Sequence, residues 1–342
     1  MKDSPTEVKS EVWSYVPQAG FYDEVFNDAA EVRPHWDSLT DSLTRMGAVG
    51  LARRWQEGRR LIRENGVTYN VYGDAESTTR PWPVDPIPLT IGPEEWKGIE
   101  AAIQQRATLL NKILLDLYGE QRLLRERFLP PDLVFPNTSF LRPCRGIETP
   151  GKEFLHVYSA DIARSPDGKW WVLSDRTQAP SGAGYALENR LVTTRVLQDA
   201  FREANVRRLA PFFQSYKETL QSLARTNRDN PRIVLLTPGP YNETYFEHAF
   251  LARYLGYTLV EGADLTVRDD HVFLKTLGGL LPVDVILRRQ DDYFCDPVEL
   301  RSDSMLGIPG LLQAVRTGNV AVANALGSDA VESPAYAPFL PG

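Results

Sequence analysis

Residues 157–190 constrain the fold more than any other stretch of this sequence. Two runs with the composition of β-strands, 157–164 and 169–175, flank the turn signal Pro166-Asp167-Gly168. A glycine-rich loop and then a helical segment follow the second run. The pattern predicts an antiparallel strand pair that leads through a loop of small residues into a helix. Because an acid and an arginine lie near the end of each strand, the segment is a candidate metal and nucleotide-phosphate site.

The composition narrows the class of protein. With 342 residues, 42% of them hydrophobic, the chain can fill the cores of two or three domains. A formal net charge of −7 argues against nucleic-acid binding, because neutralising phosphates requires a basic face. Cys144 and Cys295 lie far apart in sequence, which suits a reducing compartment. Without an apolar leader or a run of about 18 apolar residues, we expect a cytoplasmic protein that does not enter a membrane.

Helical spacing dominates the first two thirds of the chain outside the strand pair. The expected helices are 34–65, 93–118 and 188–224. Asn65-Gly66 is a stop signal for the first, and Pro211 is expected to break the third. Between the first two, 67–72 predicts a short strand, whereas the prolines of 80–88 exclude regular structure because proline removes amide donors.

The last third of the chain alternates strands with helices. A polar turn at 227–231 marks the best internal boundary. A helix is expected at 244–255, among strands at 232–237, 258–260, 272–274, 283–287 and 320–322. The alternation predicts a small doubly wound domain. We therefore expect a mixed α+β (α/β) chain with a leader at 1–34, a helical and antiparallel-sheet lobe at 35–228, and a Rossmann-like domain at 229–342.

Asp161 and Asp175 could share one cation only if both point to the same face of the strand pair. Successive side chains of a strand alternate between faces, so a two-residue loop would separate the two carboxylates and a three- or five-residue loop would bring them together. Two carboxylates beside phosphate oxygens suit Mg²⁺. The alternative is that Asp175 caps or pairs with Arg164 or Arg176.

The loop Ser181-Gly182-Ala183-Gly184 could present backbone amides to a phosphate. It does not match Gly-x-Gly-x-x-Gly, because Leu187 stands at the third glycine position, and it lacks the Gly-Lys-Ser/Thr of a Walker A loop. A turn of small residues before a helix that starts at Glu188 is the competing interpretation.

Polar residues also follow the first strand of the α/β domain, where open sheets of this kind bind ligands. Asn242, Glu243 and His248 could contact a substrate amine. Glu247 has a simpler explanation, because Thr244 and Glu247 have the spacing of a helix capping box.

A second charged group, Arg288-Arg289-Gln-Asp291-Asp292, ends the strand at 283–287. An arginine at a strand end could hold a carboxylate or a phosphate through two parallel hydrogen bonds. A cluster of mutual ion pairs is the alternative.

Taken together, these segments resemble the circularly permuted ATP-grasp type 2 family, relatives of glutathionylspermidine synthetase. The blocks that carry the resemblance are Arg33-Pro-His-Trp36, 66–73, Arg80-Pro-Trp-Pro83, Phe140-Leu-Arg-Pro-Cys144, 174–190, Gly239-Pro-Tyr-Asn242, Tyr245-Phe-Glu-His248, Ile286-Leu-Arg-Arg289, Asp291-Asp292 and 322–328. The resemblance implies ATP-dependent ligation of a carboxylate to an amine through an acyl phosphate, with ATP and Mg²⁺ as cofactors.

Position by position, the resemblance also implies site residues. Asp161 and Asp175 match the family's Mg²⁺ ligands, whereas Thr177 stands where glutathionylspermidine synthetase has an asparagine ligand. The implied catalytic arginines are Arg164, Arg176, Arg288 and Arg289. The implied nucleotide contacts are Gln178, Ser181, Gly182 and Gly184. The implied substrate contacts are Asn242, Glu243, His248 and Asp291.

The family continues into a segment that supplies lysines for the ATP phosphates, whereas this sequence stops at Gly342. We therefore expect an incomplete ligase that acts on small-molecule or peptide acids and amines. The alternative is an inactive member that serves as a binding or assembly component among the proteins of a peptide synthesis or modification system. A third alternative, an α/β protein that never used ATP, predicts Asp161 and Asp175 on opposite faces.

Overall fold

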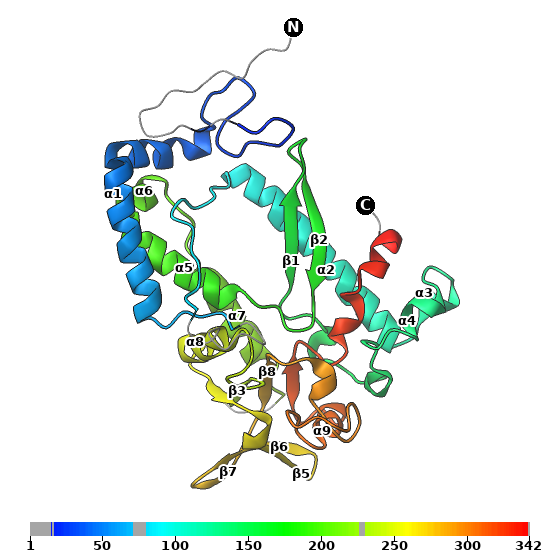
Figure 1. Cartoon of the computed structure of the whole chain (residues 1–342). Coiled ribbons are helices and arrows are strands. Elements are labelled where there is room, and N and C mark those ends of the chain that lie inside the picture. The colour runs from blue at the N-terminus through cyan, green and yellow to red at the C-terminus, as the bar shows by residue number, and fades with distance from the viewer. Residues whose placement is uncertain (1–14, 16, 71–79, 226–229, 341–342) are drawn as a thin grey trace. The chain divides into compact units, whose positions relative to one another are not determined.

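The computed structural model describes residues 15, 17–70, 80–225 and 230–340, and Figure 1 shows the course of the chain. Two compact units emerge, each assembled from three segments: 1–102, 162–172 and 185–209 in the first, and 103–161, 173–184 and 210–342 in the second. Part of the expected leader and most of the expected boundary at 227–231 lie outside the described residues. The expected division at 228 therefore stays a prediction.

The first unit is built on α1 (Asp37–Glu64). The helix bends at Gly47, whose φ of 68° and ψ of 168° are not helical (Figure 1). It ends at Asn65, followed by Gly66 with a φ of 65°, so the predicted stop signal is confirmed. An ion pair of 2.6 Å between Arg45 and Glu203 joins it to α6 (Gln198–Glu203).

The connection after α1 is irregular in its described part. Instead of the strand expected at 67–72, Thr68 forms a single bridge with Pro81, and residues 71 and 72 lie outside the described part of the chain. Residues 80–88, all described, contain neither helix nor strand, as their prolines predicted.

The predicted helix at 93–118 and the strand pair form in the expected order, with two short α-helices between them that the sequence did not predict. The elements of this part of the chain are α2 (Pro93–Tyr118), α3 (Arg122–Arg125), α4 (Pro131–Val134), β1 (Ser159–Arg164), β2 (Trp170–Arg176), α5 (Ala183–Val196), α6 and α7 (Ala210–Ser222). Short 3-10 helices among the described residues are η1 (Pro34–Trp36), η3 (Arg142–Cys144), η4 (Pro150–Lys152), η5 (Gly262–Asp264), η6 (Asp292–Phe294), η7 (Ser328–Val331) and η8 (Pro334–Phe339).

A three-residue loop joins β1 to β2. The Gly168 amide donates to the oxygen of Ser165, and the Ser165 amide donates to the oxygen of Lys169, each at 2.9 Å. Gly168 has a φ of 83°, the left-handed conformation that this turn requires and that glycine adopts without strain. The loop therefore has the odd length that a shared metal site would need.

The helix expected at 188–224, with a break at Pro211, is divided once more than predicted, because three helices occupy that range. α5 begins at Ala183, so Glu188 lies inside it rather than at its start. Leu197, with a φ of −116° and ψ of 47°, separates α5 from α6. Pro211 lies in the first turn of α7, where a missing amide costs little, so the break near this proline is confirmed.

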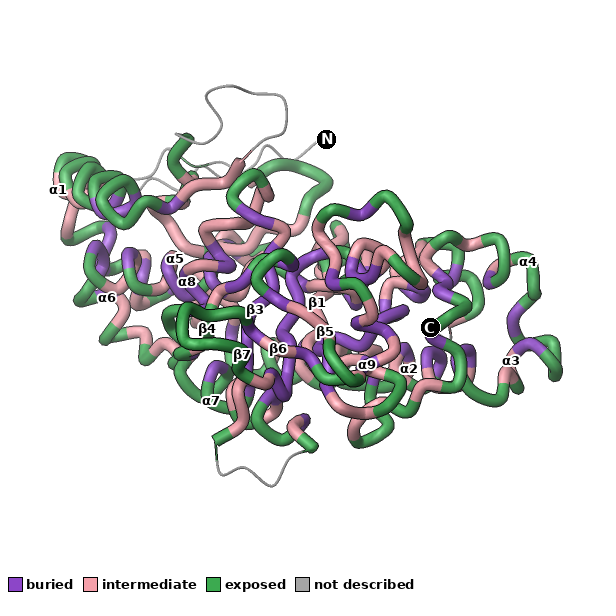
Figure 2. Tube along the Cα trace, turned by 90° about the horizontal axis from the view of Figure 1, so that it is seen from below, coloured by how far each residue is buried: buried purple, intermediate pink, exposed green. Residues whose placement is uncertain are grey.

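The second unit contains an all-parallel sheet in the order β4-β3-β8-β9. Its elements are β3 (Ile233–Leu236), α8 (Tyr245–Leu255), β4 (Thr258–Val260), β8 (Val285–Arg288), α9 (Leu311–Arg316) and β9 (Ala321–Ala323). Every residue of β3 and β8 is buried, as a parallel sheet covered on both faces requires (Figure 2). The connections run outward in opposite directions from β3 and β8, which makes the gap between these strands the topological switch point.

The strand expected at 272–274 forms, but in a separate sheet. β5 (Leu265–Arg268), β6 (His271–Thr276) and β7 (Gly279–Pro282) make an antiparallel meander. The hydrophobic core of the second unit includes Leu110, Leu114 and Leu117 of α2, all fully buried. Within the described residues, no helix combines the length and apolar character needed to cross a membrane.

Candidate functional site

The carboxyl ends of β3, β8 and β9 carry buried polar residues. Thr237 follows β3, Arg288 ends β8 with Arg289 next to it, and Asn324 follows β9. Since strands of an open parallel sheet bind ligands outside their carboxyl ends, this edge is the candidate site.

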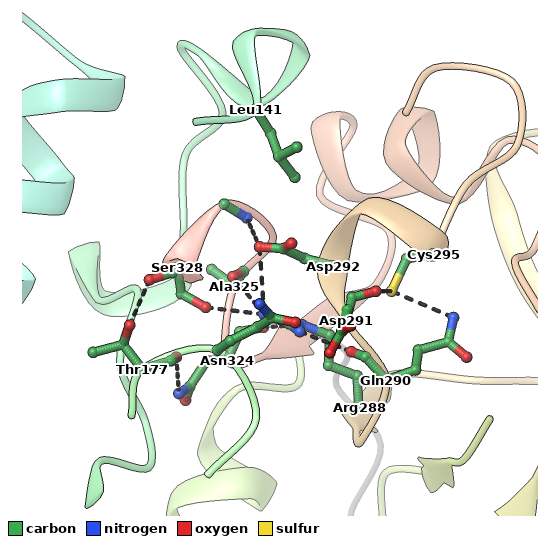
Figure 3. Close-up of polar contacts among 12 residues, drawn as sticks. Leu141, Thr177, Arg288, Gln290, Asp291, Asp292, Cys295, Asn324, Ala325 and Ser328 are labelled. Carbon is green, nitrogen blue, oxygen red and sulfur yellow. Dashed lines mark hydrogen bonds and ion pairs between the residues drawn. The ribbon is translucent and has the colours of Figure 1, made fainter. Parts of the chain in front are cut away.

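Arg288 is saturated with hydrogen bonds. Its buried guanidinium donates to the backbone oxygens of Asn324 (2.9 Å), Gln290 (2.9 Å) and Ala325 (3.3 Å) and to Oγ of Ser328 (2.9 Å) (Figure 3). These acceptors use most of the five donors of one arginine. The contacts therefore give Arg288 a structural role, tying β8 to the segment after β9, and leave it few donors for a substrate.

Asp292, rather than Asp291, lies inside this edge. Its carboxylate is fully buried, 3.8 Å from Arg288, and accepts the Gly327 amide at 2.9 Å. Burial raises the pKa of Asp292 to about 6, while the nearby Arg288 charge acts in the opposite direction. Asp291 is exposed.

Asn324 connects β9 to both ends of the β1–β2 hairpin. Its Oδ1 accepts the amides of His156 (2.8 Å) and Val157 (2.9 Å), and its Nδ2 donates to the oxygens of Val157 (2.6 Å) and Thr177 (2.7 Å). This side chain fixes where the glycine-rich loop begins. It lies inside the block 322–328 that carried the family resemblance, but its role was not foreseen.

Glu332 holds the start of the same loop. One carboxylate oxygen accepts the amide of Gln178 at 2.6 Å and also the amide of Thr177. Burial raises the pKa of Glu332, and the two amides act to lower it. Nothing in the spacing of the sequence marked Glu332, because its partners lie more than 150 positions earlier.

Glu247 holds the other end of the loop. Its Oε1 accepts the amides of Gly182 and Gly184, both at 2.8 Å, and its Oε2 lies 3.4 Å from an Nη of Arg289. The amides predicted to receive a phosphate therefore bind a carboxylate of the chain itself. The capping box predicted for Glu247 is wrong, because the Glu247 side chain makes these contacts and Thr244 makes no side-chain cap bond within the described residues.

His248 is a buried, neutral imidazole. Nδ1 lies 2.9 Å from Oγ1 of Thr237, and Nε2 lies 3.1 Å from Oγ1 of Thr244. Burial and the Arg289 charge lower the pKa of His248 well below its ordinary value. Because both ring nitrogens contact hydroxyls, the His248 side chain links the end of β3 to the first turn of α8.

The remaining predicted substrate contacts lie before α8. Oδ1 of Asn242 accepts the amide (3.0 Å) and the hydroxyl (2.9 Å) of Thr244, which closes the turn that leads into the helix. Glu243 is half-buried in the same turn, and Ser181 is exposed on the glycine-rich loop.

Asp175 is buried and pairs with two half-buried side chains, Arg106 and Tyr158. Arg106 of α2 donates from Nε (2.7 Å) and Nη2 (2.8 Å) to its two oxygens, and the hydroxyl of Tyr158 donates to Oδ1. Such a bidentate pair is a strong, oriented contact. The expected alternative partners, Arg164 and Arg176, do not make it.

Asp161 is exposed and binds different residues. Its Oδ2 accepts from the hydroxyl of Ser174 and from Arg176 at 2.9 Å. Ser174 and Arg176 flank Asp175 on β2, so their side chains and that of Asp175 point to opposite faces. Asp161 and Asp175 therefore lie on opposite faces, although the loop has an odd length. The alternation of exposed and less exposed residues along β2 is interrupted at Asp175, which is buried.

The arrangement does not fit a Mg²⁺ ion shared by Asp161 and Asp175. Each carboxylate is already paired with its own arginine, and within the described residues no group of three or more potential ligands could hold a metal. We derive no step of a reaction through a metal held by this pair.

Arg164 belongs to the first unit and is committed there. Its side chain, 7% exposed, forms ion pairs with Glu24 (2.7 Å) and Glu95 and stacks on the rings of Tyr22 (4.4 Å) and Trp170 (4.1 Å). These contacts give Arg164 a packing role. Of the four predicted arginines, Arg176 and Arg289 retain unused donors.

The described structure is mixed α+β, as the sequence predicted, with a parallel sheet whose switch point is lined by charged groups. The chain belongs to the circularly permuted ATP-grasp type 2 family, whose model matches residues 88–342.

Sequence relatives match almost the whole chain. An uncharacterized protein of Mycobacterium tuberculosis is 41% identical over 333 residues, covering 95% of this chain and 38% of the relative. An uncharacterized protein of Synechocystis is 38% identical over 328 residues, covering 96% of this chain and 68% of the relative. A second M. tuberculosis protein is 38% identical over 307 residues, covering 90% of this chain and 55% of the relative. The chain thus spans well under two thirds of the length of both M. tuberculosis relatives.

A glutathione synthetase-like effector from Globodera pallida, solved in its apo form, aligns with a TM-score of 0.45 and 15% identity, over 78% of this chain and 63% of that chain.

Proposed function

We propose that this chain forms part of an ATP-dependent carboxylate–amine ligase that works through an acyl phosphate. The observation that carries the proposal is the family match over residues 88–342. The polar switch point at the ends of β3 and β8 supports it, because open α/β sheets place substrates there. ATP is the cofactor we propose, with the metal that accompanies it bound elsewhere than between Asp161 and Asp175.

The chain's own residues would act mainly by positioning and by electrostatics. In the first step the substrate carboxylate would be held in line with the γ-phosphoryl group, with ADP as the leaving group. In the second step the amine would be held against the carbonyl carbon of the acyl phosphate, with phosphate as the leaving group. Arg176 is the phosphate contact we propose, because its side chain is 55% exposed at the start of the loop that carries Gln178 and Ser181. Arg289 is the arginine we propose for the substrate acid.

Titration calorimetry with Mg·ATP tests the proposal on this chain. We expect Arg176→Gln to weaken Mg·ATP binding about tenfold, since a charge-assisted hydrogen bond contributes about 1.5 kcal/mol or more. The matched control is Arg301→Gln, because Arg301 forms a similarly exposed ion pair with Asp303 (2.7 Å). Equal loss in both variants, or no binding by the unaltered chain, would contradict the assignment.

Turnover separates this proposal from its rival. A ligase releases ADP from Mg·ATP only when both an acid and an amine are present, which a coupled ADP assay with pooled amino acids and polyamines measures. ADP release that needs neither substrate would contradict ligation.

The second candidate is a non-catalytic member that binds other proteins of a peptide synthesis or modification system. It is favoured by the engagement of Arg164 and Arg288 in structural contacts. The separation of Asp161 from Asp175 is what the third alternative, an α/β protein that never used ATP, predicts, whereas the family match over residues 88–342 argues against that alternative. Binding of Mg·ATP without ADP release under any substrate pool would support the non-catalytic member.

A further inference from the structure

Two carboxylates bind amides of the loop 177–184, but only one of them lies beside an under-used arginine. Glu332 binds the Thr177 and Gln178 amides, and Glu247 binds those of Gly182 and Gly184. Beside Glu247 lies the Arg289 guanidinium, with a side chain only 3% exposed.

The buried Arg289 is poorly satisfied. Its contact with Glu247, at 3.4 Å, is long for a charge-assisted bond, and its Nε has no hydrogen-bond partner among the described residues. A buried guanidinium left with free donors is costly, so the arrangement is stable only if something else contributes. The neighbouring Arg288, by contrast, donates hydrogen bonds to four acceptors.

The hydroxyl of Tyr216 is a second buried and unused donor in the same unit. It is buried without a partner among the described residues, and the charges of Arg289 and Glu247 both act on its pKa, which burial raises to about 12. His248 cannot compensate, because both of its nitrogens contact hydroxyls. The amides of Gly182 and Gly184 and the guanidinium of Arg289, all of which contact the Glu247 carboxylate, together make a site for a small oxyanion.

We propose that these groups form a carboxylate-binding site, that Glu247 occupies it as an internal stand-in, and that a carboxylate of the acid substrate displaces Glu247. The ligand class follows from the occupant: the amides of Gly182 and Gly184 already hold a carboxylate at 2.8 Å. The planar guanidinium of Arg289, whose Nε is free, could donate to both oxygens of the incoming substrate carboxylate.

Access and relocation are both available. Gly182 is half-buried and Ser181 is exposed, whereas Gly184 is buried, so a small ion would approach the Gly182 amide first, from the loop side. A displaced Glu247 carboxylate lies in the first turn of α8, where the helix dipole stabilises negative charge. The Thr244–Glu247 spacing of a capping box, unused in this structure, fits that second position.

The test measures the midpoint of thermal unfolding against sodium acetate, with sodium chloride at matched ionic strength as reference. In Glu247→Gln the competing charge is gone, so we expect the apparent acetate dissociation constant to fall at least about tenfold relative to the unaltered chain. Glu332→Gln is the matched control, because it removes a carboxylate from two amides of the same loop without touching Arg289. It should leave the acetate response unchanged.

Two further variants keep the test decisive. The double variant Glu247→Gln with Arg289→Gln should lose the acetate response, and its retention would overturn the site. If Glu247→Gln does not fold, Glu247→Asp withdraws the carboxylate by one methylene and should still strengthen acetate binding several-fold. An unchanged acetate response in every folded Glu247 variant overturns the proposal, and a response to phosphate that exceeds the response to acetate overturns the carboxylate assignment.

The inference rests on the proposed function only where it assigns the displacing carboxylate to the acid substrate of a ligase. Acetate binding without Mg·ATP binding would support the carboxylate site and contradict the proposed ligase. Ligation with no acetate effect in the variants would do the reverse.

Discussion

Arg288 and Arg289 are adjacent in sequence and both buried, yet their surroundings differ in kind. Arg288 donates to three backbone oxygens and one hydroxyl, none of which carries a charge. Arg289 has one long contact with a carboxylate and an unused Nε. Because successive residues of a strand point to opposite faces, Arg288 contacts the segment after β9 while Arg289 points toward Glu247 and the glycine-rich loop. Burial alone therefore does not separate a structural arginine from a binding one, whereas the count of satisfied donors does.

The largest effect should come from replacing the two arginines in parallel. Arg288→Met removes the donor to the buried carbonyls of Asn324 and Gln290 and leaves the buried Asp292 carboxylate without its neighbouring positive charge, so we expect a loss of about 3–5 kcal/mol in unfolding free energy. Arg289→Met in a Glu247→Gln background removes a poorly satisfied pair and should cost less than about 1.5 kcal/mol. Urea denaturation of both variants measures the difference. Equal losses would remove the distinction between the two arginines.

A smaller effect should follow from crowding the Arg289 side alone. In Gly184→Ala the added Cβ would lie 2.7 Å from Cγ of Glu247, so the glutamate side chain has to move. We expect a loss of about 1–3 kcal/mol in urea denaturation together with a stronger acetate response, because the internal carboxylate is displaced. Gly98→Ala, where a Cβ meets no atom within 4 Å, is the control. If Gly184→Ala destabilises the fold without changing the acetate response, Glu247 is not the competitor.

The sequence predicted features that depend on neighbouring residues better than features that depend on distant ones. Local signals located most elements correctly: the Asn65-Gly66 stop, the Pro166-Asp167-Gly168 turn and the buried strands around Leu235 and Ile286 all depend on neighbours in sequence. The long helix expected at 188–224 failed at Leu197, whose non-helical backbone has no marker in its residue type.

Site residues were harder to predict because their partners are remote. Glu247 matched a local capping pattern but binds amides more than 60 positions earlier. Asp175 pairs with Arg106, and Glu332 with Thr177, across separations that no spacing rule covers. Strict alternation made an odd loop the condition for a shared face, and the loop is odd, yet Asp161 and Asp175 lie apart because the alternation of exposure along β2 is interrupted at Asp175. Periodicity therefore located the strands, while tertiary packing decided which side chains meet.

The smallest expected effect is a pH dependence on the Arg288 side. Burial raises the pKa of Asp292 to about 6, against an ordinary value near 3.8. The folded state therefore binds this proton more tightly than the unfolded state does, so the unfolding free energy contributed by Asp292 falls as the pH rises from about 4 to about 6, by on the order of 1–3 kcal/mol. Asp292→Asn should lose that slope when urea denaturation is repeated across this pH range. Asp303→Asn, on an exposed ion pair, should keep it. A slope that is the same in Asp292→Asn and in the unaltered chain would show that Asp292 does not titrate in this range, and Arg288 and Asp292 would then form a full ion pair rather than an arginine satisfied by neutral acceptors.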